Sequence, residues 1–266
     1  MSNKKVKTNK AIKTVELVDV VKLDDVVKKA LSKYKKIIGQ DHLTPREAFE
    51  LTFGSGSYVG GTVISVLLPV NEKIRKTNAA QKELASKEWA LLRTFGDEMF
   101  LGLRTYVKKF ISELGYRTVA PLLETWYKIN VTESGPCSNW SERHIAYAAG
   151  LGTFGINDGF ITEKGIAIRL VSVITELKLT PNVRLATTHT ENCLFYSKNK
   201  CGACIKRCPV GAISLAGHDK MKCLQYVYGE ESRKLAESYG GIAKLGSGCG
   251  LCQTNVPCES KNPVNK

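Results

Sequence analysis

The sequence predicts an α+β protein with two domains, on the strength of three observations. Apolar strand-like segments at residues 60–69 and 165–177 alternate with helical patterns in the first part of the chain. Eight of the nine cysteines lie after residue 192. A chain of 266 residues is long enough for one large domain and one small domain. We therefore expect a basic tail at 1–15, an α/β domain at 16–185 and a cysteine-rich domain at 186–266.

The first element signals are helical. Apolar residues recur at helical spacing over residues 16–38, which suggests one or two helices. Thr44-Pro45-Arg46-Glu47 is a capping box with proline at the first helical position, so a short helix should follow and end at Gly54. Residues 60–69 then predict a strand that is apolar enough to be covered on both faces.

Further along, residues 79–114 have a helical pattern in which Gly96 and Gly102 are weak points. Residues 116–123 return to strand-like sequence. A short helix should begin near Ser141, and a second buried strand should occupy residues 165–177.

The formal net charge of +14 comes from 39 basic and 25 acidic residues. Such a charge attracts polyanions and acidic redox partners. Five of the lysines fall in the polar tail at 1–15, which is typical of a disordered segment. No basic-aromatic nucleic-acid motif accompanies the others, so a solubilising surface explains them more simply.

The apolar runs are short. The best, Val63 to Val70, is far below the roughly 20 residues that cross a bilayer. The N-terminus Met-Ser-Asn-Lys-Lys has no apolar region of the kind that directs export. We therefore expect a cytoplasmic protein without membrane association.

The cysteine spacing is the strongest chemical signal. The stretch Cys201-Gly-Ala-Cys204-Ile-Lys-Arg-Cys208-Pro209 matches the last three ligands of the bacterial ferredoxin run C-x2-C-x2-C-x3-C-P. The position of the first ligand is Lys198, and the nearest upstream cysteine is Cys193. We interpret residues 194–200 as a loop insertion within this motif.

Four more cysteines complete two sets. In two-cluster ferredoxins, the cysteine before the proline ligates the other cluster. Applied to this chain, the rule assigns one [4Fe-4S] cluster to the first thiol set, Cys193, Cys201, Cys204 and Cys258. It assigns the other cluster to the second thiol set, Cys208, Cys223, Cys249 and Cys252. The domain at 186–266 is then ferredoxin-like.

Zinc and disulfides are the alternatives. A structural zinc site usually closes with two pairs of ligands and does not call for C-x3-C-P or for the lone Cys223. Disulfides need an oxidising compartment, which the N-terminus does not indicate. Iron–sulfur ligation explains the spacing better than either.

A glycine-rich loop follows the helix near Ser141, in Ala149-Gly150-Leu151-Gly152-Thr153-Phe154-Gly155-Ile156-Asn157. Glycines at this spacing allow backbone to approach a large ligand closely, such as one that bears phosphate. A helix C-cap followed by a turn would need the same glycines. The loop is not a dinucleotide fingerprint, since there the glycines open a helix after a strand.

Together, the Glu142-Arg143 pair, this loop and the interleaved cysteines resemble the epoxyqueuosine reductase family and its relatives among reductive dehalogenases. The resemblance covers roughly residues 63–258. It implies a nitroreductase-like α/β domain that binds cobalamin base-off, beside a ferredoxin-like domain with two [4Fe-4S] clusters. It also implies a low-potential electron donor such as ferredoxin or flavodoxin.

On this resemblance, five residues should contact the cobalamin. They are Arg143, Gly150, Gly152, Gly155 and Asn157. The chain departs from the family in reading Gly155-Ile156-Asn157 where a lysine is common between the glycine and the asparagine. The position of the family's acidic proton donor falls on Pro136, and no helical-repeat extension that grips tRNA follows Cys258. We therefore expect a small-molecule substrate rather than tRNA.

Cys137, beside Pro136, is the ninth cysteine and belongs to neither thiol set. As a hypothesis, its thiol faces the cofactor and supplies a proton or a thiolate, because a helix N-terminus lowers a thiol pKa. A small buried side chain is the simpler role for a free cysteine.

The sequence thus predicts an iron–sulfur oxidoreductase that passes electrons through two [4Fe-4S] clusters to a cobalamin, which reduces an unidentified substrate. The alternative is a ferredoxin-type electron-transfer protein that has neither cobalamin nor an activity of its own. Binding of cobalamin discriminates between the two.

Overall fold

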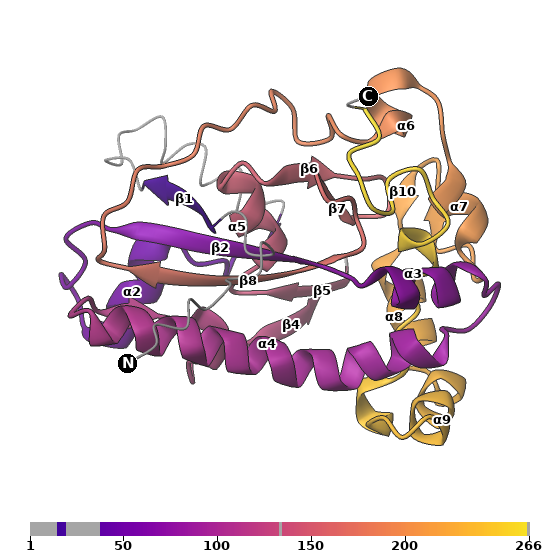
Figure 1. Ribbon diagram of the computed structural model, residues 1–266, viewed down its shortest axis with the longest axis horizontal. Helices are drawn as coiled ribbons and strands as arrows, with labels where there is room; N and C mark the ends of the chain where they lie inside the picture. The colour runs from indigo at the N-terminus through magenta and orange to yellow at the C-terminus, as the bar shows by residue number, and fades with distance from the viewer. Residues whose placement is uncertain (1–14, 20–37, 133–134, 265–266) are drawn as a thin grey trace, which may run out of the picture.

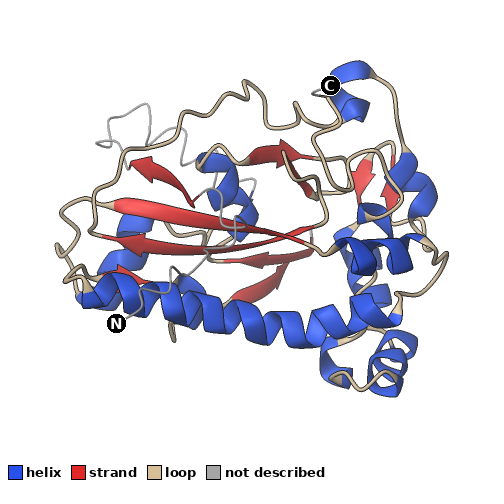
Figure 2. Cartoon of the chain, in the orientation of Figure 1, coloured by secondary structure: helices blue, strands red, loops and turns tan. Residues whose placement is uncertain are grey.

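The computed structural model describes residues 15–19, 38–132 and 135–264 (Figure 1). Within them the chain has a mixed α+β fold, which confirms the predicted class. The long strands lie in one part of the molecule, and most of the short helices gather around the cysteine-rich segments in another (Figure 2). The basic tail predicted at 1–15 lies outside the described residues except for Val15.

The helices are α2 (Pro45–Phe53), α3 (Glu72–Ala79), α4 (Lys87–Glu113), α5 (Glu142–Ala148), α6 (Leu194–Lys198), α7 (Ala203–Arg207), α8 (Lys220–Val227) and α9 (Glu230–Ser238). The strands are β1 (Val15–Asp19), β2 (Thr62–Pro69), β3 (Thr118–Val119), β4 (Ile129–Thr132), β5 (Gly135–Ser138), β6 (Gly152–Phe154), β7 (Phe160–Thr162), β8 (Ile168–Thr175), β9 (Ile213–Ser214) and β10 (Gly217–His218). Short 3-10 turns occupy Pro121–Leu123, Ala243–Leu245 and Leu251–Gln253.

The central sheet is antiparallel, with the strand order β1-β2-β8-β3. Val63 of β2 lies opposite Ile174 of β8, and both pack with Phe49 of α2 on one face of the sheet. The next pair, Ile64 and Val173, packs on the other face against α4. The sheet is therefore covered on both faces, as the apolar sequence of these strands predicts.

Several predicted elements are confirmed. The Thr44 hydroxyl accepts a hydrogen bond from the Glu47 backbone N–H, and the Glu47 carboxylate accepts one from the Thr44 N–H at 2.7 Å. Helix α2 then ends at Gly54 as expected. Gly96 and Gly102 do not interrupt α4, and the side chains of Leu92 and Phe100 lie beside Gly96.

Other expectations need correction. The helix predicted over residues 16–38 is wrong at its start, since Val15–Asp19 is a strand paired with β2. Antiparallel pairing with the long apolar strand β2 favours a strand here and outweighs the helical spacing of the apolar residues in this segment. The other predicted residues up to 37 lie outside the described residues. The strand predicted over 116–123 shrinks to the two residues of β3, because Pro121 begins a 3-10 turn.

Helix α4 runs along the whole molecule and reaches from the sheet to the cysteine-rich segments (Figure 1). At that end, Arg75 of α3 pairs with Glu259 at 2.7 Å, and the Asn78 amide donates to the carbonyl of Cys249. The domain boundary near residue 185 stays a prediction. Contacts between α3, α4 and the C-terminal segments nevertheless hold the two parts of the chain together.

In the described part of the chain, every helix is too short or too polar to cross a lipid bilayer.

Candidate functional site

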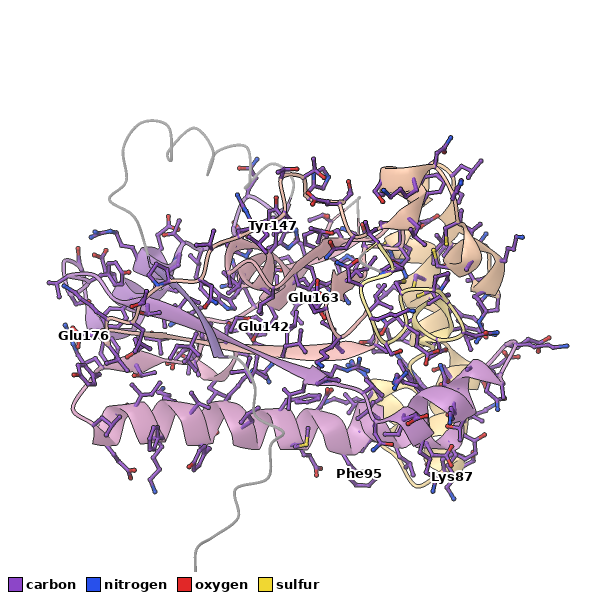
Figure 3. The ribbon with its side chains drawn as sticks, turned by 45° about the horizontal axis from the view of Figure 1, so that its top comes forward. Lys87, Phe95, Glu142, Tyr147, Glu163 and Glu176 are labelled. Carbon is purple, nitrogen blue, oxygen red and sulfur yellow. The ribbon has the colours of Figure 1, made fainter. Side chains whose placement is uncertain are left out.

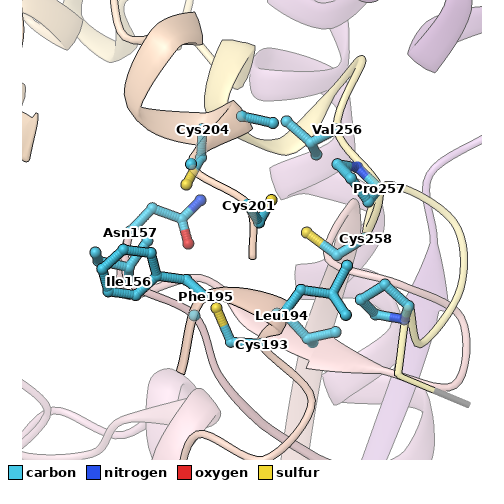
Figure 4. Close-up of a pocket in the computed structure, with 15 residues that line it drawn as sticks. Ile156, Asn157, Cys193, Leu194, Phe195, Cys201, Cys204, Val256, Pro257 and Cys258 are labelled. Carbon is cyan, nitrogen blue, oxygen red and sulfur yellow. The ribbon is translucent and has the colours of Figure 1, made fainter. Parts of the chain in front are cut away.

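The first thiol set lines one pocket. Cys193, Cys201, Cys204 and Cys258 surround it together with Phe195 and Val256, and Figure 4 shows the sulfur atoms of these cysteines around a common space. Cys193 is the N-cap residue of α6 and Cys204 lies in α7, while Cys258 comes from the C-terminal segment. The Ile166 N–H donates to the Cys258 carbonyl at 2.7 Å and so fixes that segment against the sheet domain.

The insertion predicted at residues 194–200 explains how Cys193 reaches this pocket. Residues 194–198 form the single turn of α6, after which Asn199 adopts a left-handed conformation with φ of 49°. The Lys200 N–H then donates to the Leu194 carbonyl at 3.1 Å, which closes the segment on itself. The seven residues between Cys193 and Cys201, five more than in the motif, are taken up locally, and Cys193 lines the same pocket as Cys201 and Cys204.

The second thiol set lines a neighbouring cavity of about 400 Å³ that opens to solvent. Cys208 follows α7 and Cys223 lies in α8. Cys249 precedes Gly250, and Cys252 lies in the 3-10 turn that Gly250 caps. The Cys208 sulfur accepts a hydrogen bond from the Ala212 N–H at 3.1 Å. Backbone donors of this kind stabilise a thiolate or a cluster-bound sulfur.

Burial opposes ionisation of these thiols. It is the main cause that raises the pKa of Cys258 to about 12 and that of Cys204 to about 11, and the other thiols of the first set add to the effect. Burial also raises the pKa of Cys249 to about 11 and that of Cys252 further. Buried thiols such as these two of each set ionise together only where a cationic centre compensates their charge, as an iron core does.

No three His, Cys, Asp or Glu side chains of residues 38–132 and 135–264 converge closely enough to hold a metal ion. Each thiol set instead stands around a pocket, and its members come from separate backbone segments. This suits a [4Fe-4S] core, because each of its four irons takes one thiolate.

Asn157, predicted to contact a cofactor, lies between the two thiol sets and lines both cavities. Its amide nitrogen donates to the Cys252 carbonyl at 3.0 Å, and its side-chain oxygen accepts from the Gly159 N–H at 3.1 Å. Gly155 lines the pocket of the first set. Both residues therefore belong to the cysteine site.

Gly150 and Gly152 line neither cavity. Gly150 has a φ of 83° and follows Ala149, the C-cap residue of α5, where the Leu151 N–H donates to the Ala146 carbonyl at 3.0 Å. Gly152 pairs with Thr162 in the β6–β7 hairpin, and a Cβ there would overlap the Ile161 carbonyl. Backbone geometry explains both glycines, and their contact with a cofactor stays a prediction.

Cys137 also lies away from both cavities. It occupies β5 opposite Asn130 of β4, and its sulfur packs against the backbone of Gly39. The hairpin pairing directs the side chain to that contact. The structure therefore places the Cys137 thiol outside both thiol pockets, and the hypothesis that it faces a cofactor stays a prediction.

Arg143, the last of the predicted residues, does reach the second cavity from α5, and its Nη1 donates to the Asp158 carbonyl at 3.1 Å. Its neighbour Glu142 lies near the middle of the molecule (Figure 3) and pairs with Arg104 at 3.5 Å. Burial raises the pKa of Glu142, against the opposing effects of Ser172 and Arg104.

The sequence analysis missed other side chains of the second cavity. They include Trp89 and Arg93 of α4, Arg169 of β8, and His218 of β10. His218 pairs with Asp158 at 3.2 Å, and this hydrogen bond is the main cause that raises the pKa of His218 to about 9. One signal was present: Arg169 is a charged residue within the otherwise apolar strand sequence of β8.

The sequence analysis also missed Arg207, which lies between Cys204 and Cys208. Its side chain stabilises the segment that carries part of the second thiol set. Its Nε donates to the carbonyls of Leu251 and Thr254 at 3.2 Å, and its Nη1 donates to the Gln81 carbonyl at 2.6 Å. One side chain thus links α7 to the turn that carries Cys252 and to the α3–α4 loop.

No known protein-family model matches the chain, and no curated protein matches it. Among solved structures, it is similar to an epoxyqueuosine reductase in complex with an epoxyqueuosine-modified tRNA stem loop, with a TM-score of 0.49, 18% identity and 92% of this chain covered. The epoxyqueuosine reductases from Bacillus subtilis (TM-score 0.47, 17% identity, 92% of this chain) and Streptococcus thermophilus (0.46, 16%, 93%) are similar to it as well. The chain spans 60%, 60% and 62% of these three proteins, respectively. Structural similarity to epoxyqueuosine reductase thus extends over most of this chain at low sequence identity.

Proposed function

We propose that the chain is an iron–sulfur oxidoreductase of the epoxyqueuosine-reductase-like kind, with residues 186–264 as its ferredoxin-like part. The observation that carries the proposal is the arrangement of eight thiols in two pockets, with the memberships that the ferredoxin crossover rule assigns. Clusters of this type carry single electrons at low potential.

The side chains of the site do three things in this proposal. The first and second thiol sets hold one [4Fe-4S] cluster each. Asn157 and the Ala212 N–H donate to groups of the second set, which orients them. Because Asn157 lines both pockets, the two clusters would lie close together, as electron transfer between them requires.

We further propose that a cobalamin takes up part of the second cavity. The cavity has apolar side chains at Phe160 and Ile168 and polar ones at Arg143 and Asn157, a mixture that suits a corrinoid ring with amide side chains. When bound, a corrinoid supplies a cobalt centre that can reduce a small molecule. Arg143 and Asn157 would hold it from the α5 and β6–β7 sides of the cavity.

A second candidate is an electron-transfer protein without a corrinoid. The observation that favours it is the placement of Gly150 and Gly152, which serve a helix cap and a hairpin rather than a ligand. In both candidates a low-potential donor such as ferredoxin or flavodoxin supplies the electrons, and the net charge of +14 suits an acidic partner.

The test is reconstitution without oxygen, with iron and sulfide, followed by EPR of the partly reduced protein in the presence and absence of cobalamin. We expect about eight iron atoms per chain and signals of two reduced [4Fe-4S] clusters. A base-off cobalt(II) signal establishes the reductase, whereas clusters with cobalamin left free establish the electron carrier. Stoichiometric zinc without bound iron would overturn both candidates.

Binding of tRNA is a separate proposal that rests on charge alone. It predicts an affinity that falls steeply between low and moderate salt. Electrophoretic shifts with unmodified tRNA at two salt concentrations check it.

A further inference from the structure

The second cavity carries more positive charge than the thiol sets require. Three arginines line it, from α4, α5 and β8, and we call them the arginine wall: Arg93, Arg143 and Arg169. They lie in the same cavity as the second thiol set. The cavity's own carboxylate, Glu142, is already engaged by Arg104, and burial raises its pKa.

Arg169 is the central member of the wall. It lies on β8 between the apolar residues Ile168 and Leu170, and its guanidinium sits over the Trp89 ring at 5.4 Å from the centroid. Its Nη1 donates to the backbone carbonyl of Ile168 at 2.9 Å. Among the described residues, no carboxylate lies within ion-pair distance of it. The guanidinium is therefore a largely buried cation with no described carboxylate in direct contact.

The other two arginines add to this charge. Arg93 donates to the Tyr228 hydroxyl at 2.7 Å and meets Asp97 at 3.4 Å near the surface, while its Nε is buried without a hydrogen-bond partner in the described structure. Within the described structure, Arg143 donates hydrogen bonds only to a backbone carbonyl, that of Asp158. Burial lowers the pKa of Arg169 to about 10, and repulsion from Arg93 and Arg143 contributes, with Asp97 opposing it.

A buried cation is costly unless an opposite charge and further hydrogen bonds accompany it. An oxyanion supplies both, because guanidinium groups match the oxygen atoms of phosphate and carboxylate in a two-pronged geometry. Trp89, Phe160 and Tyr228 line the same cavity and suit the apolar or aromatic remainder of a small molecule.

We propose that the arginine wall binds the phosphate or carboxylate group of a small-molecule substrate, with Arg169 as its principal ligand. The bound group would lie in the cavity that Cys208, Cys223, Cys249 and Cys252 line, and hence beside the second cluster. The assignment of a substrate to this site rests on the proposed function. The assignment of an oxyanion to it rests only on the arginines.

The experiment is titration calorimetry with inorganic phosphate and with acetate, on the protein before and after anaerobic reconstitution. The variant is Arg169→Gln, and the matched control is Arg184→Gln, which removes an exposed arginine that stacks on Tyr147 outside the cavity. We expect Arg169→Gln to weaken binding of at least one anion tenfold or more, and Arg184→Gln to leave binding unchanged. Equal binding by all three proteins, or no binding by the wild type, overturns the inference.

If Arg169→Gln does not fold, Arg93→Gln provides the same comparison, because Arg93 lies partly at the surface, with 29% of its side chain exposed. Iron content after reconstitution reports on the proposed function separately. Anion binding by a protein that takes up no iron would leave the oxyanion site standing and remove only its role as the substrate site.

The phosphodiester of cobalamin is another source of the same chemistry. Cobinamide, which lacks that phosphodiester, separates the two sources. If the wall holds a substrate group, phosphate and cobalamin bind together, and Arg169→Gln affects cobalamin and cobinamide equally. If phosphate competes with cobalamin but not with cobinamide, the wall belongs to the corrinoid and the substrate assignment is wrong.

Discussion

At the scale of single residues, the nine cysteines separate into three environments. Four thiols surround the first pocket, four line the second cavity, and Cys137 packs against Gly39 in a hairpin. Cys137 is therefore an internal control for the other eight cysteines, since it carries the same thiol but lines neither pocket.

We therefore predict that Cys258→Ser loses about half of the reconstituted iron, because one cubane lacks a thiolate and the other keeps all of its ligands. Cys137→Ser should keep the full iron content. Iron and sulfide analysis with EPR measures both. The assignment of thiols to clusters is wrong if Cys258→Ser retains all its iron, or if Cys137→Ser loses iron to the same degree.

His144 provides a pH-dependent residue outside the thiol sets. Its ring lies between Phe154 and His42, with a Ser141 hydroxyl 2.7 Å from Nδ1. Burial lowers the pKa of His144 to about 4, and the positive charges of His42, Arg143 and Lys220 contribute, with Asp158 opposing them.

Since the unfolded chain titrates near pH 6.5, it binds a proton between pH 6.5 and 4 that the folded state does not bind. The contribution of His144 is therefore present above pH 6.5 and is lost as the pH falls towards 4. We expect a loss of about 1 kcal/mol between pH 7 and pH 5.5, and a smaller loss in His144→Gln. Urea unfolding at the two pH values tests this, and identical losses in both proteins would contradict it.

At the scale of elements, the turn that carries Cys249 and Cys252 depends on close packing against α4. Gly250 has a φ of 64°, and a Cβ at this position would overlap the Trp89 indole. Gly211 has a similar φ of 61°, but a Cβ there would meet only the end of the flexible Lys222 side chain at 3.7 Å.

Gly250→Ala should therefore lower the stability and reduce the iron held by the second thiol set. Gly211→Ala should cost only about 1 kcal/mol, the penalty of a left-handed alanine. Urea unfolding and iron analysis of the two variants give the comparison. Equal effects of the two substitutions would show that backbone conformation, and not contact with Trp89, is the reason why glycine is needed at position 250.

At the scale of the whole molecule, the two parts of the chain differ in what stabilises them. The sheet of β1, β2, β8 and β3 packs on both faces, against α2 and α4. The C-terminal helices are only five to nine residues long and are marginal without tertiary support. In the proposed holoprotein, the clusters join several of these short segments.

We predict that removal of iron by a chelator exposes residues 186–264 to trypsin before it exposes residues 62–175. Mass spectrometry of the early fragments identifies the sites, and the cuts should begin at the exposed Lys198 and Lys200, next to Cys201. The reconstituted protein is the control and should resist cleavage there. First cuts within β2 or β8, or equal rates with and without iron, would contradict the prediction.

Much of the fold was predictable because its signals are local. The capping box at Thr44, the buried strands β2 and β8, and the helix after Ser141 all follow from residues within a few positions of one another. The prediction was wrong at β1, where the outcome depends on pairing with residues 62–66, more than forty positions further along.

The sequence alone determined the α+β class and the division of eight cysteines into two groups, because cysteine spacing limits which thiols can reach the same pocket. Only the tertiary structure decided which other side chains join them. Arg93, Arg143 and Arg169 are far apart in the chain, and packing of α4, α5 and β8 brings them to one cavity. Packing likewise gives Gly150, Gly152 and Cys137 backbone and hairpin roles away from it. A sequence motif describes spacing along the chain, and residues that meet from distant segments have no such fixed spacing. These assignments therefore need the folded chain.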